Sequence, residues 1–169
     1  MTDDEALAHD LRELRRGRLP AIVLIAVRLG GKKTLVVTVA YDPVADAPQL
    51  VLRAVGWEPC DRLGGPFVVV DQTALALVLA MAAEALPGAR AKRDQPAVLA
   101  QAGQYRAVLA LADCQRSLIL ADIAGVQRDA PLLSVPASAV GKVAEALALA
   151  ERRLGTSGAV TGLAGEVAH

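Results

Sequence analysis

The residue types that most often carry enzyme chemistry are scarce in this sequence and stand far apart. A serine or cysteine nucleophile needs a base within hydrogen-bond reach. The two histidines, His9 and His169, lie in a charged segment near the start and at the last position. Together with Cys60 and Cys114 they do not supply the set of about four ligands that zinc requires. We therefore expect a protein that is not an enzyme and that has no metal and no other cofactor.

Two aspartates and one glycine–lysine run are the remaining candidates for chemistry. Asp113 and Asp122 could form a carboxylate pair, which keeps an enzyme of unrecognised type as an alternative. Asp113 is more typical of a turn, and Asp122 falls in an apolar strand, where it should face solvent or pair with Arg106. The run GGKK at residues 30–33 is predicted to join two strands rather than to precede a helix, so we interpret it as a turn and not as a phosphate loop.

Basic side chains are concentrated in parts of a chain whose total charge is zero. Lys and Arg number 18, as do Asp and Glu, but residues 12–33 hold seven bases and one acid. The strand predicted at residues 49–57 places Gln49, Arg53 and Trp57 on one face, where a cation stands beside an aromatic ring. Such a surface suits a phosphate backbone with stacked bases. Alternatively, these charges only keep a hydrophobic chain soluble.

Length and composition predict one globular domain, or two very small ones. The chain has 169 residues, of which 54% are hydrophobic, so it can bury a sizeable core. Residues 1–18 lack the apolar stretch of a signal peptide, and the most apolar stretch, residues 73–86, is shorter than the about 20 residues that span a bilayer. With two scattered cysteines, these features favour a cytoplasmic protein with no membrane partner.

One helix, four strands and a second helix are predicted in the first half of the chain. Residues 3–16 begin with acids, end with bases and carry leucines every three or four residues, which is typical of a helix. Alternating and β-branched residues then predict strands, and Asp71 or Thr73 can cap the helix that follows. The predicted strands are residues 21–29, 34–41, 49–57 and 67–70, and the second helix is residues 73–86.

The second half repeats this order, with strands at residues 97–100, 105–112, 116–124 and 132–135 and a helix at 138–154. After a shift of 65 residues, PFVVV at 66–70 aligns with PLLSV at 131–135, and four positions are identical between residues 66–78 and 131–143: 66/131, 70/135, 74/139 and 78/143. Chance similarity between segments rich in Ala, Val and Leu is the alternative. We predict an α+β fold of two ββββα repeats with mainly antiparallel sheet, in which each helix covers the strands of its own repeat. The predicted parts are an N-terminal helix (1–18), a first unit (19–88), a linker (89–95), a second unit (96–155) and a mobile tail (156–169).

The predicted helix at residues 73–86 is apolar on almost every side. A helix of this kind cannot expose half of its circumference to water, so it is either wedged at the centre of the molecule or buried in a subunit interface. In the second case Leu75, Leu79 and Met81 contact a second copy, and the protein is a homo-oligomer. A third possibility is that its many alanines are simply tolerated at the surface.

Two four-strand units that each pass from a short strand into a helix, as in PFVVVDQTALALV and PLLSVPASAVGKV, resemble the PC4/Whirly-like folds. The second unit is the more similar, because YRAVLALADCQRSLILADIAG followed by PLLSVP matches that family's hairpin and junction. Members of that group bind single-stranded nucleic acid. The resemblance implies that this chain does so with basic and aromatic side chains on the outer strand faces. The matching positions are Arg28, Lys32, Lys33, Arg53, Trp57, Tyr105, Arg106 and Arg116.

Two functions from different classes are consistent with these patterns. The first is a non-catalytic protein that binds single-stranded DNA or RNA through its sheet, with Tyr41 and Tyr105 adding stacking. The second is a protein-interaction or oligomerisation module that uses the apolar helix at residues 73–86 and the edges of the sheet. Whether the basic residues share one face of the fold is the observation that separates them best.

Overall fold

The computed structural model describes residues 2–30, 33–55, 66–112, 115–124 and 130–167. In the first half, the observed helices and strands end within two residues of the predicted positions. They are α1 (Asp3–Arg15), β1 (Ile22–Gly30), β2 (Lys33–Asp42), β3 (Ala47–Val55), β4 (Phe67–Val68), α2 (Gln72–Ala85) and the 3-10 turn η1 (Leu86–Gly88). Asp71 caps α2, as one of the two predicted residues, by accepting a hydrogen bond from the Ala74 N–H at 3.0 Å.

The second half contains the predicted strands and a longer helix than predicted. Its elements are β5 (Ala97–Ala102), β6 (Tyr105–Ala112), β7 (Gln115–Asp122), β8 (Ala130–Pro136), the 3-10 turn η2 (Ala137–Ala139) and α3 (Val140–Val167). The sequence predicts that the last helix ends at Gly155, but α3 continues through it. Gly155 has no positive φ, so it continues the helix, at a cost of about 1 kcal/mol relative to alanine. Residues 156–167, predicted as a tail, therefore belong to this helix.

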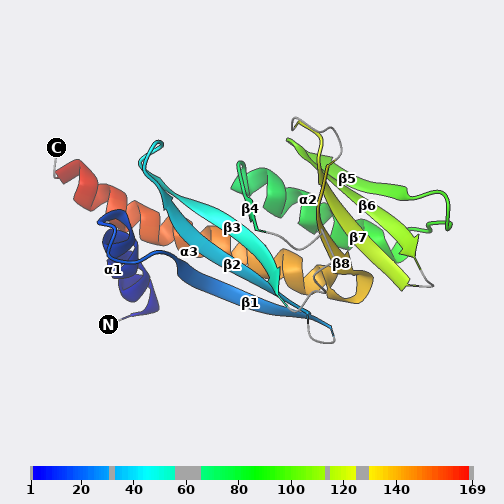
Figure 1. The fold of residues 1–169 in the computed structure, drawn as a ribbon, viewed down its shortest axis with the longest axis horizontal. Coiled ribbons are helices and arrows are strands. Elements are labelled where there is room, and N and C mark those ends of the chain that lie inside the picture. Colours follow the sequence, from blue (N-terminus) through cyan, green and yellow to red (C-terminus); the bar gives the residue numbers. More distant parts are fainter. Residues whose placement is uncertain (1, 31–32, 56–65, 113–114, 125–129, 168–169) are drawn as a thin grey trace.

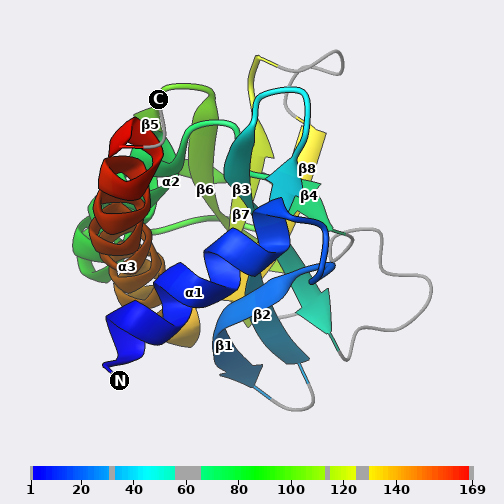
Figure 2. The ribbon, with the colours of Figure 1, turned by 90° about the vertical axis from the view of Figure 1, so that its left-hand side faces the viewer.

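The strands form two antiparallel sheets, which confirms the predicted α+β class. Their orders are β1-β2-β3-β4 and β5-β6-β7-β8, so each sheet is built from one repeat. Figure 1 shows the two sheets next to each other along the length of the molecule. In Figure 2, α2 and α3 lie on the left and the strands lie to their right, so the molecule has a helical side and a sheet side.

Both sheets carry the same irregularity in their first strand. The pairing of β1 with β2 shifts register after Val23, and the pairing of β5 with β6 shifts after Val98. The residues around the two bulges are similar, IVLI at 22–25 and AVLA at 97–100. A bulge is a specific local feature that alters strand twist, so its repetition supports the predicted relation between the two halves.

Each long helix covers the sheet of the other repeat. The first repeat's α2 packs on β5 and β6, and the second repeat's α3 packs on β1, while α2 and α3 also contact each other. The prediction that each helix covers its own strands is therefore wrong. Only residues 69–71 separate β4 from α2, and β8 passes directly into η2. With so little chain at the junction, each helix continues beyond its own sheet instead of folding back over it.

One hydrophobic core therefore joins both repeats. Leu75 of α2 is 0% exposed, Leu79 is almost as deeply buried, and both belong to the cluster that includes the buried residues of the two sheets. The sequence leaves three alternatives for α2: a central position, a subunit interface, or tolerance at the surface. The structure places α2 at the centre of the molecule. The expectation that Leu75 and Leu79 form a subunit interface is wrong, because this chain already buries them. Met81 remains partly exposed.

The N-terminal helix α1 docks on this core by the leucine stripe that the sequence predicts. Leu7, Leu11 and Leu14 are buried, and α1 packs mainly against α3. At its start, the Thr2 side chain and Glu5 form a capping box, which satisfies backbone N–H groups that have no partner within the helix.

Candidate nucleic-acid interface

The outer faces of the two sheets, which point away from α2 and α3, are the surfaces that the sequence assigns to nucleic acid. Side chains alternate along a strand, and the opposite face carries buried residues such as Leu35, Val37 and Leu52. On the first sheet the outer rows are Val23, Thr38, Val51 and Val68; Ala26, Val36 and Arg53; Arg28, Thr34 and Val55; and, toward the β2–β3 turn, Ala40 with Gln49 and Asp42 with Ala47. On the second sheet they are Val98, Val108, Ile119 and Ser134, and Gln101, Arg106 and Ala121.

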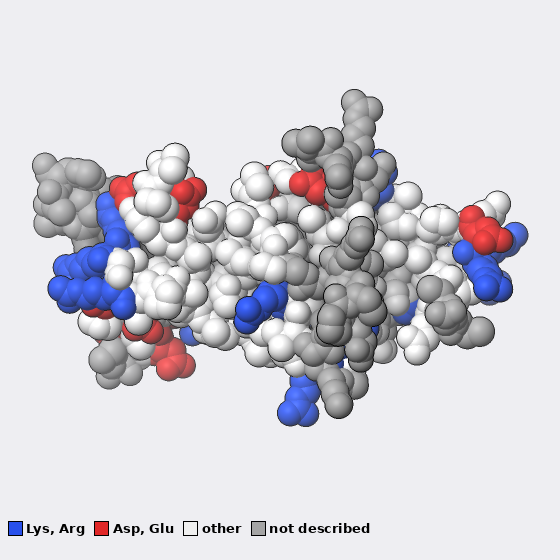
Figure 3. All heavy atoms as spheres, viewed as in Figure 1, with Lys and Arg blue, Asp and Glu red and all other residues white. Residues whose placement is uncertain are grey.

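Three of the four charged residues in these outer rows are arginines. Arg28 and Arg53 are exposed on the first sheet. Arg106 is half-buried on the second sheet, and its Nε donates a hydrogen bond to Gln101 Oε1 at 3.3 Å. The one acid in these rows is Asp42 at the end of β2, and it accepts a hydrogen bond from the Val44 N–H at 3.0 Å. Figure 3 views this side and shows Lys and Arg atoms near its middle and at both ends, and Asp and Glu atoms toward the ends and the upper edge.

Between the arginines, the outer rows are largely apolar and β-branched. Val23 is 64% exposed and Val98, at the equivalent bulge of the second sheet, is 63% exposed. Val55 and Val68 are also exposed. Large apolar side chains gathered on one face of a sheet are typical of a surface that contacts another molecule.

The basic run that begins in α1 does not extend this surface. Arg15 forms an ion pair with Asp46 at 2.9 Å, and Arg16 and Arg18 each contact Glu13 at 3.2 Å. Burial alone raises the pKa of Glu13, but the hydrogen bonds and charges of Arg18 and Arg16 lower it below its ordinary value. Three of the seven bases in this part of the sequence are therefore paired with acids near α1.

Neither tyrosine that was expected to stack on bases lies on an outer face. Tyr105 is fully buried, burial raises its pKa, and its hydroxyl accepts a hydrogen bond from the Val70 N–H at 3.1 Å. Tyr41 is half-buried on the helix side of β2 and donates a hydrogen bond to Asp46. This bond and the Arg15 guanidinium lower the pKa of Asp46. The expectation of stacking is wrong for both rings, because alternation places them on the core side.

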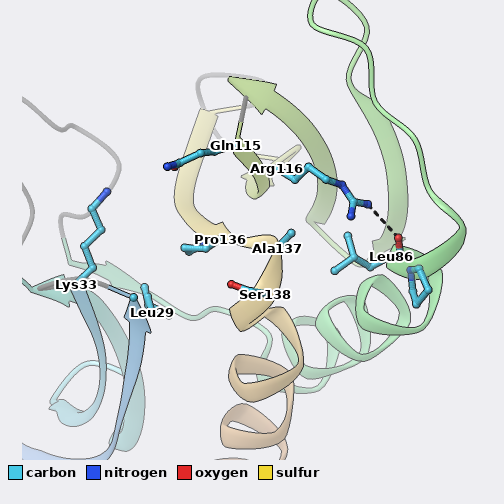
Figure 4. Close-up of a pocket in the computed structure, with 10 residues that line it drawn as sticks. Leu29, Lys33, Leu86, Gln115, Arg116, Pro136, Ala137 and Ser138 are labelled. Carbon is cyan, nitrogen blue, oxygen red and sulfur yellow. Dashed lines mark hydrogen bonds between the residues drawn. The ribbon is translucent and has the colours of Figure 1, made fainter. Parts of the chain in front are cut away.

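Lys33 and Arg116 also lie on the helix side rather than on an outer face, so their predicted position is wrong. Lys33 is two residues from the buried Leu35, and Arg116 is two residues from the buried Leu118. Both line a cleft of about 850 Å³ between the two repeats. Figure 4 shows Lys33 on one side of this cleft and Arg116 turned toward the Leu86 carbonyl on the other.

Several other predicted residues lie outside the described part of the chain or have structural roles. Lys32 and Trp57 lie outside it, as do Asp113 and both cysteines. Asp122 accepts a hydrogen bond from Gln104 Nε2 at 3.1 Å and another from the backbone N–H two residues further on. Its carboxylate therefore stabilises the chain turn after β7.

Two groups of residues at these surfaces were not predicted. Val23 and Val98 face outward at equivalent bulges. The β-branched residues around them indicate a strand, and their alternation indicates that one apolar face is exposed. Gln115 and Ser138 line the cleft. No local signal identifies them, because the cleft exists only where the two repeats meet.

The described residues contain no group of three His, Cys, Asp or Glu that could hold a metal ion. None of the helices in the described ranges is both long and apolar enough to cross a membrane. No protein-family model matches the chain, and no curated protein matches its sequence. The function therefore has to be inferred from the geometry of the outer rows and the cleft.

Proposed function

We propose that this protein binds single-stranded nucleic acid across the outer faces of its two sheets. The observation that supports this most directly is the charge of the outer rows, where the three arginines Arg28, Arg53 and Arg106 outnumber the single carboxylate in a chain of zero net charge. An excess of positive charge on one face of a neutral protein favours an anionic partner. The paired strands fix the spacing of these arginines, so the positive charges do not depend on a flexible loop.

Arginine suits this role because its guanidinium group binds phosphate with two parallel hydrogen bonds and also stacks on bases. We therefore assign the stacking on bases to the planar guanidinium groups of the arginines and not to Tyr41 and Tyr105. Arg28 and Arg53 stand on β1 and β3, which are about 10 Å apart across the sheet, and in adjacent rows about 7 Å apart along it. Two guanidinium groups at this spacing can contact different phosphates of one strand.

Three phosphate contacts give a measurable dependence on salt. For single strands the slope of log K against log salt is about −0.7 for each neutralised phosphate, so three arginines give about −2. With few contacts and no aromatic platform among the described residues of the outer rows, binding should be weak and tolerant of sequence, as is usual when the backbone supplies most of the affinity.

The experiment is fluorescence anisotropy of labelled single-stranded DNA and RNA at low salt, with the wild type and with Arg28→Gln, Arg53→Gln and Arg106→Gln. Each substitution should weaken binding several-fold and reduce the salt slope by about 0.7. The matched control is Arg152→Gln, which removes the same charge from an exposed position on α3, on the helical side. Absence of saturable binding at low salt, or an equal loss in Arg152→Gln, contradicts the proposal.

The exposed valines favour a second candidate, a protein-interaction or oligomerisation module. Val23, Val68 and Val98 leave apolar side chains exposed to solvent, and exposed apolar patches often mark a surface that contacts another protein. Binding of this kind depends little on salt, because apolar burial rather than counterion release drives it. Light scattering over a dilution series tests self-association, and Val23→Lys should then reduce the measured mass. A constant monomer mass, together with salt-dependent oligonucleotide binding, favours the first function.

A further inference from the structure

A cleft separate from the outer faces lies where the two repeats meet. Four segments line it: the end of the β1–β2 hairpin, the end of α2, the start of β7 and the β8–α3 junction. Its volume of about 850 Å³ is within the range of about 300–1,000 Å³ that is usual for small-molecule sites. Figure 4 shows Lys33, Gln115 and Ser138 around the same opening.

The cleft combines positive charge with apolar walls. Among the lining residues that the structure describes, Lys33 and Arg116 are charged, and Gln115 and Ser138 are the other polar side chains. The remaining walls come from Leu29, Gly30, Leu86, Pro87, Pro136 and Ala137. This lining suits a ligand with one anionic group and a less polar body.

Arg116 is held in place by the backbone around the end of α2. One guanidinium nitrogen donates hydrogen bonds to the carbonyl oxygens of Leu86 at 3.3 Å and Ala89 at 3.2 Å. These bonds add to the one that the Leu86 carbonyl already accepts from the Ala89 N–H at 3.2 Å. They also fix the positive charge at the wall of the cleft, which reduces the entropy lost when an anion binds.

The first repeat provides an internal comparison. A smaller hollow of about 370 Å³ lies at the equivalent place, between the β2–β3 turn and the β4–α2 junction. Among its described lining residues the charged one is Asp42, so the sign of the charge is opposite. Under the 65-residue shift, Asp71 also aligns with Pro136 at the larger cleft. The positive lining is therefore a property of the second site and not of the repeat.

We propose that this cleft binds a phosphate monoester about the size of a mononucleotide. Lys33 provides a point charge for the phosphate, and Arg116 provides a fixed second one. Gln115 and Ser138 supply hydrogen bonds, and the proline and leucine walls contact the body of the ligand. Two sources have this chemistry: a free mononucleotide and the 5′-phosphate end of a nucleic-acid strand.

The test is isothermal titration calorimetry with adenosine 5′-monophosphate and with adenosine. The nucleotide should bind at one site per chain, and adenosine about tenfold more weakly, since hydrogen bonds to charged groups contribute about 1.5–3 kcal/mol. A second pair of probes, the same oligonucleotide with and without a 5′-phosphate, distinguishes the sources. Tighter binding of the phosphorylated strand, lost in the cleft variants below, assigns the site to strand ends; equal binding of the two strands assigns it to the free nucleotide.

The informative variants leave the Arg116 contacts intact. Lys33→Gln removes one charge from the cleft, and Gln115→Glu adds an opposing charge at an exposed position, so each should weaken nucleotide binding about tenfold while circular dichroism stays unchanged. Arg152→Gln, at an exposed position on α3, is the matched control and should bind the nucleotide as the wild type does. The proposal is overturned if the nucleotide does not bind, binds no better than adenosine, or is insensitive to both cleft substitutions. The outer-face function is tested by different residues and stands or fails separately.

Discussion

The position of Leu75 gives the sharpest test of the arrangement in which each long helix covers the sheet of the other repeat. Leu75 is 0% exposed on α2, which packs on β5 and β6 and against α3. Replacing it with alanine leaves a cavity between the two repeats, because the surrounding sheet and helix can close only partly around it. Leucine-to-alanine changes at fully buried sites lower the free energy of unfolding by about 2–5 kcal/mol. For a chain of this length that corresponds to a fall in melting temperature of roughly 5–15 °C.

The measurement is urea unfolding followed by far-ultraviolet circular dichroism, at two protein concentrations that differ about tenfold. One transition should be seen for Leu75→Ala, shifted to lower urea, since one core serves both repeats. Leu77→Ala is the matched control: it makes the same change on the same helix at a residue that is 51% exposed. It should lower the free energy of unfolding by about 0.5 kcal/mol or less.

Two results would refute this reasoning. One is an equal loss of stability in both variants, which would mean that Leu75 does not lie in a tightly packed core. The other is a wild-type midpoint that rises with protein concentration and loses this dependence in Leu75→Ala. That behaviour is expected of a residue in a subunit interface, because association stabilises a folded state by mass action.

Three further predictions address contacts between the repeats and the docking of α1. Tyr105→Phe leaves the Val70 N–H without its partner, so the free energy of unfolding should fall by about 1–3 kcal/mol in urea; an unchanged midpoint contradicts the buried hydrogen bond. Gly103→Ala should lower it by about 1–2 kcal/mol or more, because Gly103 has a φ of +54° and an added Cβ meets Ala74 Cβ at 2.9 Å; a stabilised variant contradicts this contact. The pKa of Asp46 is lowered from 3.8 by its tyrosine and arginine partners, so its stabilising effect is present above that value and is lost as the pH falls through the lower, folded-state pKa. Unfolding midpoints between pH 2 and 6 should therefore fall more steeply in the wild type than in Asp46→Asn, and parallel curves count against the interaction.

The sequence alone determined most of the local structure. Alternation and β-branched runs located the strands, and the leucine spacing of α1 predicted the face that docks. Asp71 stands before an apolar run, and it caps α2 as one of the two residues predicted for that role. These features depend on residues that are close in the chain, so their physical causes can be found in short segments. Gly155 is the exception, since a glycine can either end a helix or lie within one.

Alternation also contained information on the candidate site that was not used. Tyr105 begins a strand in which every second residue is buried, so its ring shares a side with Ala107 and Leu109. The same reasoning separates Arg106, which faces outward, from Arg116, which stands on the core side of β7. Residue type alone suggests one binding surface, but the two-residue period of a strand divides these residues between its two faces.

Only the tertiary structure decided which helix covers which sheet. The periodicity of α2 shows that it is buried but not against what, because the strands of either repeat offer an apolar face. The short junctions after β4 and β8 carry each helix past its own sheet, and this geometry also creates the cleft that brings Lys33 and Arg116 to one opening. Such a site depends on residues more than 80 positions apart, and no short-range pattern in a sequence records that distance.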